Sequence, residues 1–327
     1  SPNLEKSYSL NAYIESEKDY FSSNRFQKDQ QFWHQEFKVI PETLLIRVDE
    51  LYKNSLTAKR WKYVVPSALK NQIKEFCDQH RISLYSFFMS AFLIYFSSIR
   101  NEKETVLGTF FANRKQDERE ALGMFVSTIP FYMEIDADIS IIEWIRKVTR
   151  KQMKLLRHQK YPYNRLIQEL RKKNQDVKQL YTVGIEYQEI TTDSDLIYSE
   201  YDFNELTIHI KNYLTKDQLI FHIDYRQDLH QLHEIEMLMQ RMMTLTQRMI
   251  LHPSKKIDEL EICSEEEKQH LLVEWNDTTV DDYLNESTIH TLFEEQVEKT
   301  PHNVAIVYEN EYRTYQEINE SANRVAR

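Results

Sequence analysis

Histidine is the residue type in this sequence best suited to proton transfer or metal binding, and eleven histidines occur among 327 residues. They are scattered, and no two are adjacent. His209 and His222 lie in segments that alternate between polar and apolar residues, so they could face each other across a hairpin, with Asp224 on the same face. A zinc ion there would need a third or fourth ligand in a tetrahedral array. Solvated polar positions are the more frequent outcome, so we predict no metal site.

Other kinds of catalytic motif are missing from the sequence. It contains no Gly-x-Ser-x-Gly, no Cys–His nucleophile arrangement, no phosphate-binding loop and no zinc-ligand spacing. The two cysteines, Cys77 and Cys263, cannot form a disulfide framework. We therefore expect reduced thiols and a cytoplasmic location.

A basic cluster is the clearest candidate for a binding surface. Its members recur at helical spacing and project from one side of a predicted helix; they are Lys147, Arg150, Lys151 and Lys154. The cluster is unusual in a chain with a formal net charge of −10, a charge that itself argues against nucleic acid as a partner. An anionic partner would be attracted, and the attraction would weaken with salt. The alternative is a solvated helix face whose lysines pair with nearby glutamates.

Glycine is rare in this chain, and two of the three glycines, Gly108 and Gly123, bracket a charged loop. Because glycine has no Cβ, it lets a backbone pass close to a ligand. The alternative is that both glycines relieve strain at strand ends.

The elements that must position these residues are predicted from the periodicity of apolar side chains. Helices are expected over 11–38, 67–80, 83–99, 139–159, 162–173 and 231–251, and strands over 60–66, 104–113, 124–135, 180–188, 206–214 and 218–226. This mixed order predicts an α/β fold in which helices cover a mixed sheet. The most apolar segment, 83–99, is predicted to be a buried core helix rather than a membrane span.

The C-terminal part of the chain changes in composition. Residues 253–287 are polar and acidic, which is typical of a linker. Residues 288–327 then contain a strand and two helices, which cannot bury a sheet face. Since the chain also begins without Met, we expect a piece of a longer protein with an incomplete second domain.

Three segments of this tail resemble the beginning of an adenylation domain of nonribosomal peptide synthetases. They read WNDT (275–278), IHTLFEEQVEKTP (289–301) and TYQEINESANRVAR (314–327). In that family the glycine-rich loop that grips ATP lies further downstream. The resemblance therefore implies no nucleotide site in this chain.

Three earlier segments resemble the C-terminal half of a condensation domain of the same synthetases. They read GTFFANR (108–114), GMFVST (123–128) and HQKYPYN (158–164). The resemblance implies half of a CoA-dependent, chloramphenicol-acetyltransferase-like fold, whose two halves enclose a tunnel entered by pantetheine arms. It places at the tunnel Gly108, Asn113, Arg114, Gly123, Phe125, Ser127 and Thr128. The basic cluster of Lys147, Arg150, Lys151 and Lys154 would then suit carrier docking, because a carrier's phosphopantetheine phosphate and acidic helices are negatively charged.

The sequence departs from the condensation-domain pattern at three positions. Ser127 stands where the family has asparagine, Lys160 where it has aspartate, and Tyr132 where it has arginine. The family's catalytic HHxxxDG motif is absent from this sequence. We therefore assign no catalytic residue and expect the chain to be inactive alone, since acid–base chemistry needs such an imidazole.

The resemblance implies three parts: a C-terminal condensation subdomain (1–252), a linker (253–287) and an N-terminal adenylation fragment (288–327). The parent reaction would form an amide between a carrier-bound or CoA-bound acyl or peptidyl donor and a carrier-bound amino acid, as in lipopeptide and other antibiotic biosynthesis. One alternative is a non-catalytic condensation-like module that binds a carrier or a partner enzyme. Another is a free-standing CoA-dependent acyltransferase, which leaves the tail unexplained.

The resemblance also implies cofactors and partners. We expect no cofactor to be bound by this segment, whereas the parent would use 4′-phosphopantetheine on carrier domains and ATP with magnesium in the adenylation domain. Expected partners are acyl or peptidyl carrier domains, the N-terminal half of the condensation domain and the rest of the adenylation domain. Neither nucleic acid nor a membrane is expected.

Overall fold

The computed structural model describes residues 10–42, 46, 55–114, 125–191, 198–278, 288–309 and 311–326. The chain divides into two compact units, Ser1–Ser264 and Glu265–Arg327. Gly123 lies outside the described residues, so its assignment to the tunnel stays a prediction.

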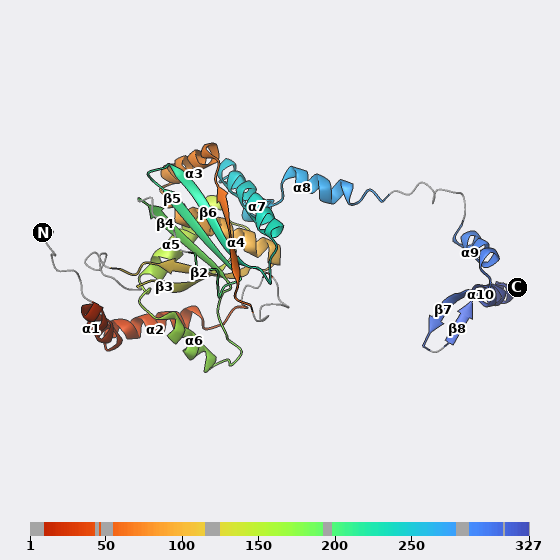
Figure 1. The fold of residues 1–327 in the computed structure, drawn as a ribbon, viewed down its shortest axis with the longest axis horizontal. Helices are drawn as coiled ribbons and strands as arrows, with labels where there is room; N and C mark the ends of the chain where they lie inside the picture. Colours follow the sequence, from red (N-terminus) through yellow and green to blue (C-terminus); the bar gives the residue numbers. More distant parts are fainter. Residues whose placement is uncertain are drawn as a thin grey trace. The chain divides into compact units, whose positions relative to one another are not determined.

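The first unit is built on a six-stranded mixed sheet with strand order β1-β6-β5-β4-β2-β3 (Figure 1). The strands are β1 (Ala58–Val64), β2 (Glu104–Phe111), β3 (Ser127–Glu134), β4 (Val183–Ile190), β5 (Leu206–Tyr213) and β6 (Gln218–Arg226). Strand β4 pairs in parallel with β2 and with β5, and the other neighbours are antiparallel. The predicted mixed sheet is confirmed, and β1 and β3 are its edges.

The helices of the first unit begin where local capping signals predict them. They are α1 (Leu10–Phe21), α2 (Asn24–Glu36), α3 (Ser67–His80), α4 (Leu84–Arg100), α5 (Ile141–Leu156), α6 (Tyr163–Arg171) and α7 (Leu232–Leu251). Pro66 and Pro162 precede α3 and α6, because proline suits the first turn, where its missing N–H is not needed. Ser140 and Glu143 form a capping box at the start of α5.

Helix α4 is the centre of the hydrophobic core. It is apolar on all sides, and most of its residues are buried, as expected for a core helix. The Phe88 ring packs edge-on against Phe221 of β6 with centroids 5.1 Å apart, and Tyr85 shares a 2.7 Å hydrogen bond with Thr109 of β2. Helix α4 also contacts α3, α5 and α7. These helices therefore lie on one face of the sheet.

Among the described residues, no single helix has both the length and the apolar composition needed to cross a bilayer. Helices α3 and α4, which are bent by 107° relative to each other, are long and apolar enough only when they are taken together.

The other face of the sheet, here called the motif face, carries polar side chains and part of the predicted tunnel. Cross-strand partners share a face, and the register pairs Gly108 with Gly184, Glu186 with His209, and His209 with His222. By the same register and alternation, the motif face includes Arg60, Lys62, Gly108, Thr128, Pro130, Gly184, Glu186, Gln188, Thr207, His209, Lys211, His222 and Asp224.

The segment that follows α7 packs against the first unit. Ile141 N donates to Lys255 O at 2.9 Å, and Ile257, in a short 3₁₀ turn (Ile257–Glu259), is buried. Residues 253–264, expected as the start of a linker, thus belong to the first unit.

The second unit contains α8 (Glu265–Gln269), a π-helical turn (His270–Glu274), α9 (Ile289–Lys299), β7 (Val304–Tyr308), β8 (Glu311–Thr314) and α10 (Tyr315–Ala326). β7 and β8 pair antiparallel, so a hairpin stands where a single strand was expected. Val297 is the one buried hydrophobic residue among those described in this unit. The described part of this unit therefore has almost no core of its own.

Candidate functional site

The three segments that carry the condensation-domain resemblance meet beside α1. Ser127 Oγ donates a hydrogen bond to Gln159 O at 2.6 Å, which joins the start of β3 to the HQKYPYN segment. The buried Phe125 ring packs edge-on against Tyr13 of α1, with centroids 4.4 Å apart. The Arg114 guanidinium lies 4.2 Å from the centroid of the same Phe125 ring. Helix α1 and the three motif segments are thus brought into one cluster.

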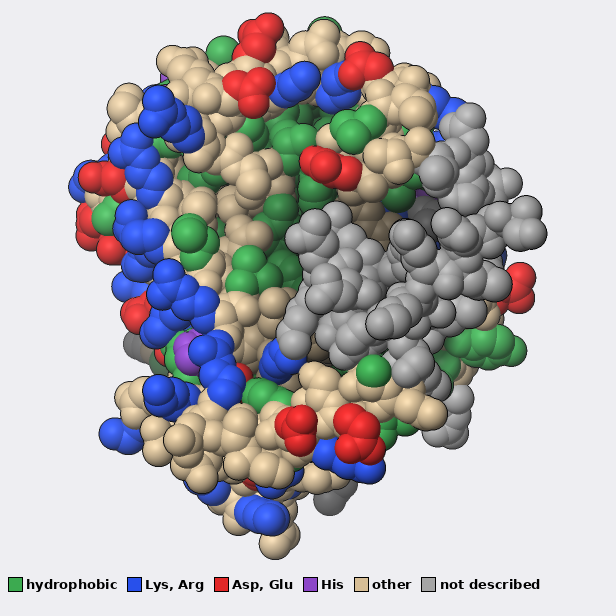
Figure 2. Space-filling model, turned by 90° about the vertical axis from the view of Figure 1, so that its left-hand side faces the viewer, with side chains coloured by type: hydrophobic (Ala, Val, Ile, Leu, Met, Phe, Trp, Pro, Cys, Tyr) green, Lys and Arg blue, Asp and Glu red, His purple; other side chains and the backbone are tan. Residues whose placement is uncertain are grey.

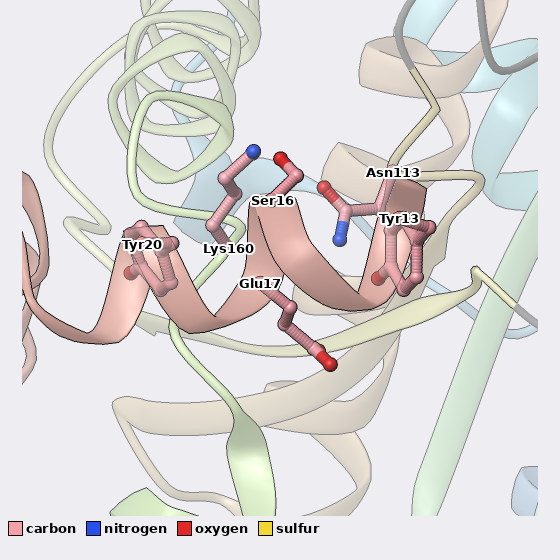
Figure 3. Close-up of a pocket in the computed structure, with 6 residues that line it drawn as sticks. All are labelled: Tyr13, Ser16, Glu17, Tyr20, Asn113 and Lys160. Carbon is pink, nitrogen blue, oxygen red and sulfur yellow. The ribbon is translucent and has the colours of Figure 1, made fainter. Parts of the chain in front are cut away.

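A small pocket opens at this meeting point (Figure 3). It is lined by Tyr13, Ser16, Glu17 and Tyr20 of α1, together with Asn113 and Lys160. Figure 3 shows Asn113 and Lys160 reaching toward α1 from two of the motif segments. The volume of about 30 Å³ suits one or two water molecules. The pocket is too small for an acyl chain as it stands.

Asn113 reaches this pocket because the chain turns sharply after β2. Its φ of 46° lies in the left-handed region, where asparagine is enriched several-fold over most residues. The turn ends the strand and presents Asn113 at the pocket wall.

Gly108 is required by a close approach, as expected, but the approaching group is a side chain of the protein itself. A Cβ at Gly108 would lie 2.2 Å from Cε2 of Tyr181. The buried Tyr181 side chain is also hydrogen-bonded to Thr128, and burial raises the pKa of Tyr181 well above its usual value. Gly108 and Thr128 therefore lie on the motif face under one aromatic ring, and their place in a tunnel stays a prediction.

Two carboxylates, one buried and one half-buried, hold α1 and α2 against the HQKYPYN segment. Asp29 of α2 is fully buried and accepts hydrogen bonds from Tyr20 Oη at 2.8 Å and His158 Nδ1 at 2.7 Å.

The second carboxylate, Glu169 of α6, accepts from Tyr161 Oη at 2.6 Å and contacts His34 Nε2 at 2.7 Å. Burial opposes ionisation of Glu169, but the hydrogen bonds from Tyr161 and His34 lower its pKa overall. The roles of Asp29 and Glu169 could not be predicted from the sequence, because their contacts with His158 and His34 span more than a hundred residues and follow no periodic pattern.

All four predicted docking residues line one open pocket, here called the α5–β3 groove. Its walls are Lys147, Arg150, Lys151 and Lys154 of α5 and Tyr132, Met133 and Glu134 of the edge strand β3, and its volume is about 400 Å³. Figure 2 shows a band of lysine and arginine side chains down one side of the face that lies on the left in Figure 1. The groove is large enough to receive a partner group.

Only part of the positive charge in the α5–β3 groove is neutralised. Lys151 contacts Glu36 of α2, and Lys147 Nζ lies 3.9 Å from Asp136 Oδ2. Burial and then the neighbouring Lys154 lower the pKa of Lys151 to about 8. Arg150 and Lys154 form no ion pair with any described residue, so they remain able to attract an anion.

A chain of ion pairs crosses the motif face from β1 to β4. Arg60 donates twice to Asp224, at 2.6 and 2.7 Å. His209 then bridges Asp224 (Nε2, 3.1 Å) and Glu186 (Nδ1, 2.5 Å), and Lys211 Nζ reaches Glu186 at 3.2 Å. We call this row the charge ladder.

The charge ladder includes His209 and Asp224, which the sequence pattern groups with His222 as possible metal ligands. The predicted pairing of His209 with His222 is confirmed by the register. Burial opposes protonation of His209, but hydrogen bonds to Asp224 and Glu186 raise its pKa overall. Both ring nitrogens of His209 already contact carboxylates, and the described ranges contain no group of three or more His, Cys, Asp or Glu side chains that could hold a metal ion.

Comparison with protein families gives one match. The model of the condensation domain matches residues 1–272. Among curated proteins, the chain is 36% identical to surfactin synthase subunit 1 of Bacillus subtilis (strain 168), over 98% of this chain and 9% of that protein. It is 33% identical to a plipastatin synthase of the same organism, over 96% of this chain and 13% of that protein. The chain thus spans about a tenth of the length of these relatives.

Solved structures share the fold. A four-domain nonribosomal peptide synthetase bound to AMP and glycine superposes with a TM-score of 0.73 at 20% identity, over 94% of this chain and 25% of that one. The first condensation domain of the calcium-dependent antibiotic synthetase, in complex with a substrate analogue, gives 0.66 at 13% identity, over 77% of this chain and 57% of that one.

Proposed function

The chain belongs to the condensation domain family of nonribosomal peptide synthetases, and we propose that it forms one wall of an amide-forming site. The convergence of three motif segments beside α1 and along the motif face carries this proposal. Asn113 and Lys160, from two of these segments, line the pocket beside α1, and Phe125 of the third segment packs against Tyr13 of α1.

The reaction we propose joins two carrier-bound substrates. The amine of a carrier-bound amino acid attacks the thioester carbonyl of a carrier-bound or CoA-bound acyl or peptidyl donor. The C–N bond forms, the C–S bond breaks, and the donor thiol leaves with the proton that the amine loses. This chain contributes one wall of the site, including its polar motif face. The histidine that accepts the proton of the amine or orients the amine belongs to the N-terminal half of the condensation domain.

We further propose that the second unit is the beginning of an adenylation domain. The tail segments from Trp275 onward support this assignment through their resemblance to that family. The pairing of β7 with β8, with few buried residues, is consistent with a fragment that completes its core with further chain. ATP and magnesium would then bind outside these residues, and 4′-phosphopantetheine would arrive on the carriers.

The α5–β3 groove is the proposed docking surface for a carrier domain. Its two unpaired cations, Arg150 and Lys154, suit the phosphate of phosphopantetheine and the acidic helices of a carrier. Exposed charge pairs of this kind lose strength as salt screens them.

The test is a titration of a ¹⁵N-labelled, phosphopantetheine-loaded carrier domain with the full chain. We expect shift changes that weaken between about 50 and 300 mM salt and at least a tenfold loss of affinity in the triple variant Lys147→Glu, Arg150→Glu, Lys151→Glu. The matched control is the triple variant Lys59→Glu, Lys172→Glu, Lys173→Glu, which changes the net charge equally outside the groove. Equal binding by both triple variants would show that carriers dock elsewhere.

A further inference from the structure

Among the residues that the structure describes, His222 of β6 stands apart, because both of its ring nitrogens are buried and neither has a hydrogen-bond partner. Buried polar atoms in folded proteins are bonded in the great majority of cases. An unmet donor and an unmet acceptor at one side chain cost free energy. A water molecule or an ion held at the ring would satisfy these atoms.

The groups around His222 are mostly cations. Its cross-strand partners are Lys62 of β1 and His209 of β5. Burial first, and then the positive charges of Arg60, His209, Lys62 and Lys211, lower the pKa of His222 to about 4. His222 is thus neutral at pH 7 and offers one N–H donor in a positive environment.

The carboxylates on this part of the motif face are already engaged. Asp224 accepts from Arg60 and His209, and Glu186 accepts from His209 and Lys211. Lys62, which is exposed, makes no ion pair with any residue in the described ranges. A third carboxylate, Asp202, lies near Asp224 and His209 and is held by hydrogen bonds from Thr207 and Asn204. The charged groups that act most strongly on His222 are basic: Arg60, His209, Lys62 and Lys211.

We propose that His222 and Lys62 form an anion subsite on the motif face, which takes an oxyanion of a carboxylate or a phosphate. The His222 N–H donates to the anion, and the Lys62 ammonium supplies the charge. Within the proposed function, on which this inference rests, the anion is part of a substrate chain, because the subsite shares its sheet face with Gly108 and Thr128.

Binding of an anion at this subsite should change the pKa of His222, which can be measured directly. A bound oxyanion stabilises the imidazolium, so it must raise the pKa of His222. A bound water molecule, the simplest other occupant, carries no charge and would leave that pKa unchanged.

The first experiment records histidine ring signals of the full, ¹⁵N-labelled chain by NMR over pH 3.5 to 8. The probes are inorganic phosphate, sodium acetate, pantetheine 4′-phosphate and pantetheine. We expect phosphate or acetate to raise the pKa of His222 by about one unit or more, with uncharged pantetheine without effect. A preference for pantetheine 4′-phosphate identifies the phosphate of the arm as the source, and a preference for acetate identifies a substrate carboxylate. No shift of His222 with any anion overturns the proposal.

The second experiment compares variants by calorimetric phosphate titration and by thermal unfolding. His222→Phe loses no hydrogen bond, so it should melt at or above the native temperature while losing phosphate affinity at least tenfold. Lys62→Ala should lose affinity without a change in melting, and Lys59→Ala on the opposite face of β1 should retain it. If His222→Phe melts lower and phosphate affinity is unchanged, His222 is a structural residue. Neither readout uses a carrier or turnover, so failure here is distinct from failure of the proposed function.

Discussion

At the scale of single residues, the chemistry of the motif face depends on close approaches and on paired charges. Gly108 could be singled out from the sequence because glycine is so rare in this chain. Its neighbour could not be predicted, because Tyr181 reaches Gly108 across the sheet from a segment more than seventy residues later. The same limit applies to the charge ladder: alternation predicted that His209 and His222 share a face, but not that carboxylates from β4 and β6 hold His209 on both sides.

Gly108→Ala should destabilise the first unit by about 1 to 3 kcal/mol, because the added methyl group overlaps the ring of Tyr181. Chemical unfolding of the full chain measures this. In a Tyr181→Ala background the same change should cost clearly less, since the overlapping ring is gone. Equal costs in both backgrounds would show that Tyr181 is not what requires glycine here.

The raised pKa of His209 predicts that the free energy of unfolding depends on pH. Its folded-state pKa is raised, so its contribution is fully present below the unfolded value of about 6.5 and is lost as the pH rises through the folded value. Urea unfolding from pH 6 to 9 should therefore show a decline that His209→Gln flattens. A decline of the same size in both proteins would assign it to other groups.

Two substitutions of Ser127 test the link between β3 and the HQKYPYN segment. In the longer synthetase, Ser127→Phe should block amide formation, because the ring displaces the contact with Gln159 O and fills space at the motif cluster. Ser127→Ala removes only one hydrogen bond, so it should cost about 1 kcal/mol of stability and retain most of the turnover. Normal turnover by a stably folded Ser127→Phe protein would place Ser127 away from the substrates.

At the scale of elements, local sequence signals predict most helix and strand boundaries, but they do not predict how the elements pack together. The apolar periodicity of α5 and the prolines before α3 and α6 are visible in sequence, and the structure begins those helices at these signals. The docking of α1 and α2 onto the HQKYPYN segment is not visible there, since it depends on Asp29 and Glu169. The hairpin of β7 and β8 was missed because β8, Glu311–Thr314, is too short to show alternation.

Asp29→Ala should loosen this docking. Tyr20 and His158 would each lose a buried acceptor, so we expect a loss of about 3 to 5 kcal/mol. Hydrogen exchange should rise in α1, α2 and residues 157–161 before it rises in the sheet. Exposed Asp19→Ala on α1 is the matched control, and identical exchange in both variants would contradict the anchoring role.

At the scale of the whole molecule, the hydrophobic core lies within the first unit. The connected core runs from Tyr20 to Ile257, whereas the second unit exposes large apolar side chains such as Ile289 and Val325, at 89% and 88%. The change in composition after Pro253 predicted a boundary in this region, but it placed the boundary before residues that pack on α5. Composition alone does not show that Lys255 and Ile257 complete the first unit.

A chain ending at Ser264 should therefore unfold with the same main transition as the full chain, within about 1 °C, because no core contact is lost. A chain ending at His252 should unfold at a lower temperature, because it lacks Ile257 and the backbone contact of Lys255 with α5. Differential scanning calorimetry of the three proteins decides this. Equal melting of the two shortened chains would mean that residues 253–264 add nothing to the first unit.

The central claim is that these residues form a wall of a condensation site whose catalytic histidine lies in another segment. The most direct measurement is amide formation, followed by mass spectrometry, from an acyl-loaded donor carrier and an aminoacyl-loaded acceptor carrier. The account predicts no amide above background with this chain alone, and product with the longer synthetase that is lost on reversing Lys147, Arg150 and Lys151 to glutamate. Amide formation by this chain alone, or undiminished product from the reversed synthetase, would contradict it.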